Sequence, residues 1–248
     1  MRILAIDIET RANLVETYQV YGEIRISPDQ IIRPVEMVSF AAKWVGEPGM
    51  EFWSKYHDSR KKMLRRIWDL LNQADVLLHY NGENFDVPHI SRELAERGFL
   101  PPSPFKQIDL YKTARRAFRF PMNKLAYVAP ALGLEHKVEH EGIIKLVRRC
   151  ERREQDALAR LKEYNVRDVE LLEALYKRLQ PWILNHPNRG AWSEEDVCRV
   201  CASHKLQRRG KAVTRAGIIY PRYHCKACGA WSQGKTALQG SPRMKAVS

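Results

Sequence analysis

The sequence has no long hydrophobic run, only five cysteines, and fewer acidic than basic residues. No stretch of about 18 apolar residues occurs in its 248 residues, so we expect no transmembrane helix. Two carboxylates fall within the first nine residues. A secretory signal has a longer apolar stretch and a small-residue cleavage site, so we do not expect secretion. Hydrophobic residues make up 44% of the chain, which excludes disorder. We therefore expect a folded cytoplasmic protein with one ordinary core and room for a small satellite.

The shortage of acidic residues is concentrated at one end of the chain. The whole sequence has 42 Lys and Arg against 29 Asp and Glu, a net charge of +13. From Pro181 onward there are 12 basic and 3 acidic residues, while the first 180 residues hold 30 and 26. A basic end on a nearly neutral body favours a polyanionic partner, most simply nucleic acid. A solvated, solubilising tail is the alternative interpretation.

The first 180 residues predict strands that later alternate with helices. We expect strands over residues 2–9, 35–45, 50–56, 76–80 and 107–111. We expect helices over residues 59–71, from about 85 or 87 to 98, and over 112–120, 124–132 and 152–179. Loops are expected over residues 11–34 and 133–142. This order of elements predicts a mixed α/β domain.

The composition changes beyond the last predicted helix. Residues 185–190 form a natural linker, and after them the chain has no helical period, four cysteines and many basic residues. We therefore expect one domain over residues 1–184, a second over 191–235, and a disordered tail over 236–248.

Two acidic residues interrupt the apolar opening strand. Asp7 and Glu9 are two positions apart, so strand alternation places both side chains on one face. Two adjacent carboxylates repel each other, and a buried strand rarely tolerates them unless a cation is present. The pair therefore indicates a metal site, or else a strand end where both acids reach water.

Further acidic residues follow at Asp86 and Asp168. Asp86 comes where the strand over 76–80 passes into a helix, a place where loops present functional groups; a helix N-cap is the alternative. Tyr164 and Asp168 are four residues apart on the long helix and share its inner face. The alternative for Asp168 is an ion pair with a nearby arginine.

The ordered set Asp7, Glu9, Asp86, Tyr164 and Asp168 resembles the DnaQ-like 3′–5′ exonucleases of the ribonuclease H-like superfamily. The tyrosine spacing matches the DEDDy branch, which includes the proofreading domains of family A and family B DNA polymerases. The sequence from Tyr80 to Asp86, YNGENFD, is similar to the second motif of the family B proofreading domains. The resemblance covers roughly residues 1–180 and implies a ribonuclease H-like mixed sheet flanked by helices.

The resemblance also implies hydrolysis of phosphodiester bonds with two Mg²⁺ or Mn²⁺ ions about 4 Å apart. Asp7 would bridge both ions, Glu9 and Asp168 would complete the site of the ion that activates water, and Asp86 would serve the second ion. Tyr164 would orient the attacking water, because a phenol with a pKa near 10 is a poor base at neutral pH.

The expected reaction releases 5′-mononucleotides from single-stranded or frayed 3′ ends of DNA during replication, repair or recombination. Alternatives on the same fold are cleavage of RNA and internal cleavage. A non-catalytic DNA-binding or scaffold protein is an alternative from another class. The resemblance points to Thr10, Asn81, Asn84 and Phe85 as contacts for the nucleic-acid strand, with core packing favoured for Phe85.

The cysteines are too few for a disulfide scaffold, but four of them form the pattern C-x2-C-x23-C-x2-C. The pattern consists of Cys198, Cys201, Cys225 and Cys228, a set of thiolates suited to one tetrahedral Zn²⁺. The spacer predicts a β-hairpin, so the module resembles a zinc ribbon. Free thiols and two redox pairs are the alternatives. A module this small buries little apolar surface, so the metal should hold it together.

Basic and aromatic residues surround the predicted zinc site. The cations that we expect to bind nucleic acid are Arg208, Arg209, Lys211 and Arg222, with Tyr220, Tyr223 and Trp231 nearby. This combination favours single-stranded or junction DNA. Docking to a replication or repair protein is the alternative.

Overall fold

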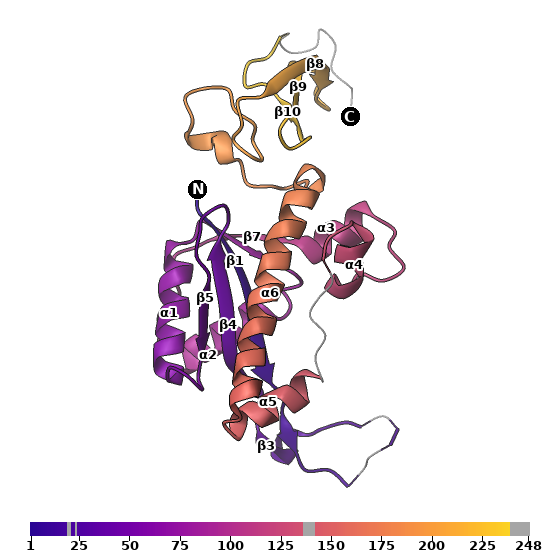
Figure 1. The fold of residues 1–248 in the computed structure, drawn as a ribbon. Helices are drawn as coiled ribbons and strands as arrows, with labels where there is room; N and C mark the ends of the chain where they lie inside the picture. The colour runs from indigo at the N-terminus through magenta and orange to yellow at the C-terminus, as the bar shows by residue number, and fades with distance from the viewer. Residues whose placement is uncertain (19–20, 23, 136–141, 239–248) are drawn as a thin grey trace. The chain divides into compact units, whose positions relative to one another are not determined.

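A five-stranded mixed sheet forms the centre of the first unit of the computed structural model, which describes residues 1–18, 21–22, 24–135 and 142–238 (Figure 1). The strands are β1 (Ile3–Arg11), β4 (Glu36–Trp44), β5 (Glu51–Ser54), β6 (Val76–His79) and β7 (Lys106–Asp109). Their order is β5-β4-β1-β6-β7, with β1 antiparallel to β4 and parallel to β6. The predicted mixed α/β fold is confirmed.

Alternate residues of β1 point to opposite faces of the sheet. Leu4, Ile6 and Ile8 are buried in one core cluster. The same cluster contains residues of helices α1 (Arg60–Gln73) and α2 (Asp86–Glu96). Because strand side chains alternate, Asp7 and Glu9 lie on the opposite face.

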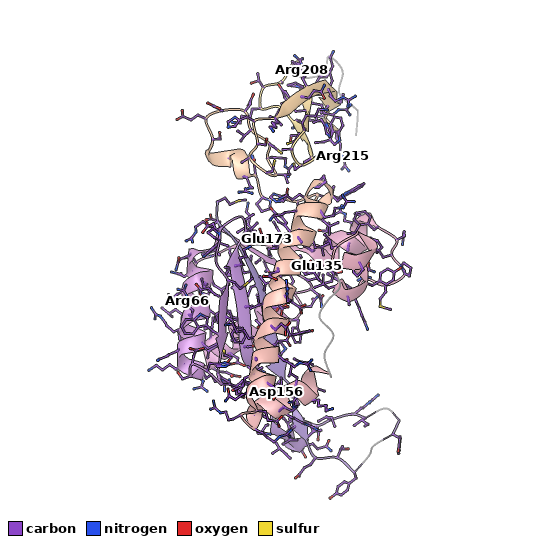
Figure 2. The ribbon with its side chains drawn as sticks, viewed as in Figure 1. Arg66, Glu135, Asp156, Glu173, Arg208 and Arg215 are labelled. Atoms are coloured by element: carbon purple, nitrogen blue, oxygen red, sulfur yellow. The ribbon has the colours of Figure 1, made fainter. Side chains whose placement is uncertain are left out.

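Helix α6 (Gln155–Leu179) covers the face of the sheet that carries Asp7 and Glu9 (Figure 1). Its buried Glu173, labelled in Figure 2, accepts a hydrogen bond from Lys43 Nζ at 2.6 Å and from the Gly46 amide at 3.2 Å. These contacts fix α6 against β4. Helix α5 (Ile143–Glu151), which was not predicted from the sequence, packs beside α6 in a second core cluster that includes Leu146 and Val147.

The structure differs from the prediction at the loop expected over residues 11–34 and at the strand expected over 107–111. The expected loop over residues 11–34 contains the short strands β2 (Leu14–Val15) and β3 (Ile31–Arg33) and the 3-10 turn η1 (Pro28–Gln30). The strand expected over 107–111 ends at Asp109 because its carboxylate accepts the Tyr111 amide at 3.0 Å and caps the next helix. The helices that follow are α3 (Leu110–Ala117) and α4 (Leu125–Ala131).

The chain divides into two compact units, Met1–Leu175 and Tyr176–Ser248. The C-terminal unit contains a three-stranded antiparallel sheet in the order β10-β9-β8. Its elements are η2 (Gln180–Trp182), η3 (Arg189–Trp192), β8 (Leu206–Val213), β9 (Ile219–Cys225) and β10 (Trp231–Gln233).

The hairpin predicted between the cysteine pairs is the β8–β9 pair, whereas β10 was not predicted. Most of the predicted tail, residues 239–248, lies outside the described residues. No helix in the described part of the chain is long and apolar enough to cross a membrane.

Candidate metal centre

Three carboxylates converge on the α6-facing side of the sheet. Asp7 and Glu9 come from β1 and Asp168 from α6, and each offers a carboxylate oxygen within 4.8 Å of the others. Asp168 is buried and the other two are half-buried. Three negative charges at this distance repel one another strongly unless cations neutralise them. The donors are all hard oxygens, which fit Mg²⁺ or Mn²⁺ rather than a thiolate-preferring metal.

Asn165 holds the Asp7 carboxylate in place. Its Nδ2 donates to Asp7 Oδ2 at 2.7 Å and to the Asp7 carbonyl oxygen at 3.1 Å. Its Oδ1 in turn accepts from Ser39 Oγ on β4 at 3.1 Å. Asn165 was not among the site residues predicted from the sequence. The available signal was a polar side chain three positions before Asp168 on the inner face of the long helix.

Asp86 is hydrogen-bonded to strand β1. It is the first residue of α2, and its Oδ1 accepts the amide of Ile8 at 3.1 Å, between the two acids of β1. Asp86 lies outside the group of three convergent carboxylates. It is 5% exposed, and burial raises its pKa to about 7.

The turn that leads to Asp86 rests on two buried side chains. The Gly82 amide donates to His79 Nδ1 at 3.0 Å, and the Asn81 amide donates to Asp109 Oδ1 at 2.8 Å. Burial lowers the pKa of His79, so the neutral ring accepts at Nδ1 and donates from Nε2 to Gln107 at 2.9 Å. A Cβ at Gly82 would lie 2.5 Å from His79 Cγ, so this turn requires glycine.

Tyr164 is buried on α6, four residues before Asp168 and next to Asn165. The structure therefore places all five predicted acid-site residues on β1, α6 and the start of α2. It brings the carboxylates of Asp7, Glu9 and Asp168 within 4.8 Å of one another and joins Asp86 to β1 by a hydrogen bond.

The residues of the first unit that are predicted to contact nucleic acid lie near the end of β1 and in the turn after β6. Thr10 is half-buried where the register of β1 against β4 shifts. Asn84 Nδ2 donates to Asn81 Oδ1 at 3.0 Å within the turn. Phe85 is 41% exposed and packs edge-on against His89, so the preference for a core position was wrong. Two other residues of α2, Val87 and Ile90, pack in the core cluster instead.

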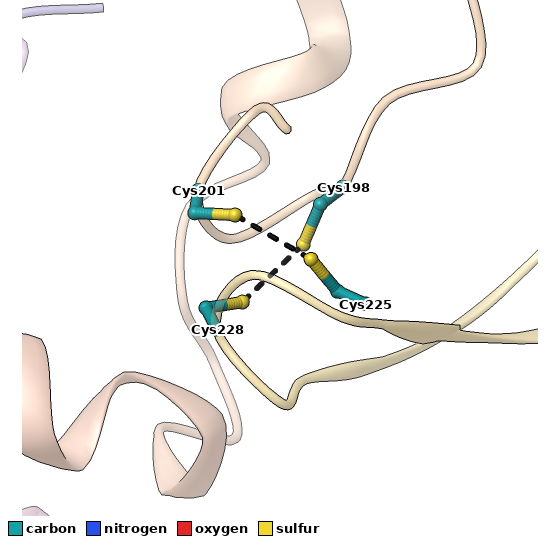
Figure 3. Close-up of side chains that lie close together, drawn as sticks. All are labelled: Cys198, Cys201, Cys225 and Cys228. Carbon is teal, nitrogen blue, oxygen red and sulfur yellow. Dashed lines mark hydrogen bonds between the residues drawn. The ribbon is translucent and has the colours of Figure 1, made fainter. Parts of the chain in front are cut away.

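A second candidate metal site lies in the C-terminal unit. The four sulfurs of Cys198, Cys201, Cys225 and Cys228 lie within 4.8 Å of one another (Figure 3). The Cys198–Cys228 and Cys201–Cys225 sulfur pairs are both 3.6 Å apart. Zn–S bonds of about 2.3 Å in a tetrahedron give sulfur separations of about 3.8 Å, so the four thiols fit Zn²⁺.

Four predicted nucleic-acid-binding cations extend from the same unit. Arg208, Arg209 and Lys211 are exposed on β8, and Arg222 is exposed on β9. The guanidinium of Arg222 stacks 4.9 Å from the Trp231 ring, and its Nε donates to the Arg209 carbonyl at 3.0 Å. Figure 2 labels Arg208 and, on the turn after β8, Arg215.

Comparison with known proteins identifies the family. Residues 37–180 match the family described as the RNase_H superfamily. The match spans more than half of the 248 residues, and the chain belongs to this superfamily.

Similar sequences occur in archaeal DNA polymerases. DNA polymerase 1 of Aeropyrum pernix is 35% identical over 72 residues, which are 28% of this chain and 7% of the polymerase. DNA polymerase 1 of Sulfolobus acidocaldarius is 30% identical over 135 residues, which are 46% of this chain and 14% of the polymerase. The chain thus spans only a small part of the length of these relatives.

A solved structure shares the fold. The family B DNA polymerase from the hyperthermophilic archaeon Pyrobaculum calidifontis matches with a TM-score of 0.56 and 18% identity, covering 73% of this chain and 24% of that chain. The predicted ribonuclease H-like fold and the predicted relation to family B DNA polymerases are therefore confirmed.

Proposed function

We propose that the first unit is a metal-dependent 3′–5′ exonuclease that acts on single-stranded or frayed 3′ ends of DNA. The observation that carries this proposal is the convergence of Asp7, Glu9 and Asp168 within 4.8 Å, in a chain of the RNase H superfamily. The similarity to archaeal DNA polymerases favours DNA as the substrate and a role in replication, repair or recombination.

The carboxylates would hold two Mg²⁺ or Mn²⁺ ions. Asp7 would serve both ions, Glu9 and Asp168 one of them, and Asp86 the other. When bound, such ions activate a water molecule and stabilise the leaving oxygen of a phosphodiester.

The side chains around the carboxylates would do the positioning. Asn165 orients the Asp7 carboxylate through one hydrogen bond to Oδ2, and its second bond to the Asp7 carbonyl anchors the amide group, so the carboxylate is already ordered before the reaction. The Ile8 amide similarly holds Asp86. The Tyr164 hydroxyl would orient the attacking water by a hydrogen bond. The expected product is a 5′-nucleoside monophosphate.

We further propose that Cys198, Cys201, Cys225 and Cys228 bind one structural Zn²⁺, and that the resulting ribbon contributes nucleic-acid binding through Arg208, Arg209, Lys211 and Arg222. A zinc site made of four cysteine thiolates has no open coordination position, so the metal would stabilise the fold and take no part in hydrolysis.

The proposal is tested with EDTA-treated protein and DNA oligonucleotides labelled at either end. Addition of Mn²⁺ should release labelled mononucleotide from the 3′-labelled strand and a descending ladder from the 5′-labelled strand. Asp7→Ala should lower this rate by about 100-fold or more. Glu47→Ala removes an exposed carboxylate of the β4–β5 turn and should leave the rate unchanged. Short internal fragments from both labels would refute an exonuclease.

A further inference from the structure

The segment from Leu110 to Leu134 differs in charge from the rest of the first unit. It has five basic residues and no acidic residue, although acids and bases are nearly balanced over the first 180 positions. It also contains four aromatic residues. This segment forms α3, α4 and the connection between them.

Most cations of this segment project away from the protein. Leu110 and Ala114 are the buried residues of α3 and form its inner face. The cations on the outer side are exposed, and none of them forms an ion pair with another described residue: Arg115, Arg116, Arg119 and Lys124. A group of unpaired positive charges repels itself, and a bound polyanion relieves that repulsion.

Aromatic rings lie between these cations. Phe118 and Phe120 have ring centroids 5.2 Å apart, and Phe120 and Tyr127 are 6.5 Å apart. Tyr127 is 39% exposed and Met122 is 48% exposed. We call Arg115, Arg116, Arg119, Lys124, Phe118, Phe120 and Tyr127 together the α3–α4 surface.

The α3–α4 surface is attached directly to the turn that carries Asp86. Asp109 Oδ1 accepts both the Tyr111 amide of α3 and the Asn81 amide of the turn. The Tyr80 hydroxyl donates to the Asn123 carbonyl at 2.7 Å, between α3 and α4. The α3–α4 surface is therefore joined to the turn that precedes Asp86.

We propose that the α3–α4 surface binds single-stranded nucleic acid, with phosphates on the arginines and bases stacked on the aromatic rings. The exposed ring of Tyr127 and the half-buried rings of Phe118 and Phe120 suit a single strand, because its bases are available for stacking, whereas those of a duplex are already paired and stacked. The link to the turn before Asp86 assigns this surface to the strand segment that precedes the cleaved 3′ end, a point that rests on the proposed function.

Binding is measured by fluorescence anisotropy in buffer without added Mg²⁺ or Mn²⁺ and without chelator, so that the result does not depend on cleavage and the C-terminal unit stays folded. The variant R115Q/R116Q/R119Q should bind a labelled oligonucleotide of about 12 nucleotides at least about tenfold more weakly. Its salt dependence, log Kd against log salt, should flatten by about 2, because each phosphate contact on a single strand contributes about 0.7. The matched control K61Q/K62Q/R97Q removes three exposed cations of α1 and the end of α2, and should bind like the wild type.

Stacking is tested separately with Phe120. Phe120→Leu keeps an apolar side chain without the ring, and should weaken single-strand binding about 5- to 30-fold. It should also reduce the quenching of 2-aminopurine placed at internal positions of the oligonucleotide. Thermal melting confirms that each variant is folded.

Three results would overturn this assignment: an equal loss of affinity in the control triple variant, an unchanged salt slope in the arginine variant, or an equal loss for blunt duplex and single strand. Displacement of the oligonucleotide by polyglutamate at equal charge concentration would instead indicate an acidic protein partner. Matched DNA and RNA strands distinguish the sugar. Retained binding with no cleavage would refute the proposed function and leave this inference standing.

Discussion

At the scale of single residues, we call Asp7, Glu9, Asp86 and Asp168 together the acidic centre. It is held by hydrogen bonds that come from three different elements. Asn165 on α6 fixes Asp7, the Ile8 amide fixes Asp86, and Ser39 on β4 fixes Asn165. Loss of a residue that orients a metal ligand typically lowers metal affinity or activity by about 10- to 100-fold. The supporting contacts therefore make predictions of their own.

Replacing Asn165 by alanine should free the Asp7 carboxylate to rotate. We expect the Mn²⁺ concentration needed for half-maximal cleavage to rise about 10- to 100-fold, with the protein still folded. Ser39→Ala removes only the partner of Asn165 and should have a smaller effect in the same direction. Titration of Mn²⁺ in a cleavage assay measures both. An Asn165→Ala variant with wild-type metal dependence would show that Asp7 needs no support.

Replacing Asp86 by asparagine should change stability in a pH-dependent way. Burial raises the pKa of Asp86 to about 7, above the unfolded value, so its protonated form stabilises the metal-free fold at low pH. That contribution is lost as the pH rises through about 7. Asp86→Asn should thus raise the melting temperature at pH 8 by about 2–4 °C, have little effect at pH 5, and reduce stabilisation by Mn²⁺.

Differential scanning calorimetry of the EDTA-treated proteins checks this difference. Because the comparison is between two proteins at each pH, the titration of all other groups cancels. If Asp86→Asn changed the melting temperature equally at both pH values, the effect would not come from the buried charge of Asp86.

At the scale of elements, the turn between β6 and α2 is the most constrained connection near the centre. Gly82 fits only because it has no Cβ to meet the ring of His79. The same turn leads to Asp86, which is hydrogen-bonded to β1. The packing of Gly82 against His79 therefore affects the position of Asp86.

The Gly82→Ala variant should lose about 1–3 kcal/mol of unfolding free energy, because its methyl group overlaps His79. It should also cleave more slowly, since either the ring or the turn has to move. In a His79→Ala background the same change should cost clearly less, which a double-mutant cycle in urea measures. Additive costs would mean that the two positions do not press on each other.

The sequence predicted the parts of the site that depend on local periodicity. Strand alternation pairs Asp7 with Glu9, and helical spacing pairs Tyr164 with Asp168. The role of Asn165 was not predictable in this way, because it depends on how α6 lies against β1. The exposure of Phe85 was missed because the run YNGENFD does not reveal that Val87 and Ile90 supply the core face of α2.

Several short elements were not predicted from the sequence. Strand β10 has three residues and β2 has two, so neither produces a visible period. Helix α5 has nine residues, several of them basic, and its burial depends on the neighbouring α6. Such elements are stabilised by tertiary packing more than by their own propensity.

At the scale of the whole molecule, the two units should depend on different metals. The five-stranded sheet has extensive apolar clusters, whereas the described cluster of the C-terminal unit consists of the cysteines and a few small or aliphatic side chains. A metal that holds together so small a core contributes folding free energy directly.

Removal of zinc should unfold the C-terminal unit and leave the first unit intact. We expect a strong chelator, or the substitution Cys225→Ser, to abolish amide protection in β8, β9 and β10 while β1, β4 and β6 keep theirs. Hydrogen exchange with mass spectrometry reads both units in one experiment. Cys150→Ser, outside the cluster, is the control. Protection that persists in β9 after zinc removal would refute a structural metal site.

The proposed function requires that the carboxylates of β1, α2 and α6 catalyse removal of nucleotides from a 3′ end. The most direct measurement compares linear and covalently closed circular single-stranded DNA of the same sequence, with Mn²⁺. We predict that the linear strand is degraded to mononucleotides, that the circle stays intact, and that Asp7→Ala degrades neither. Cleavage of the circle at the rate of the linear strand would contradict the account and indicate an endonuclease.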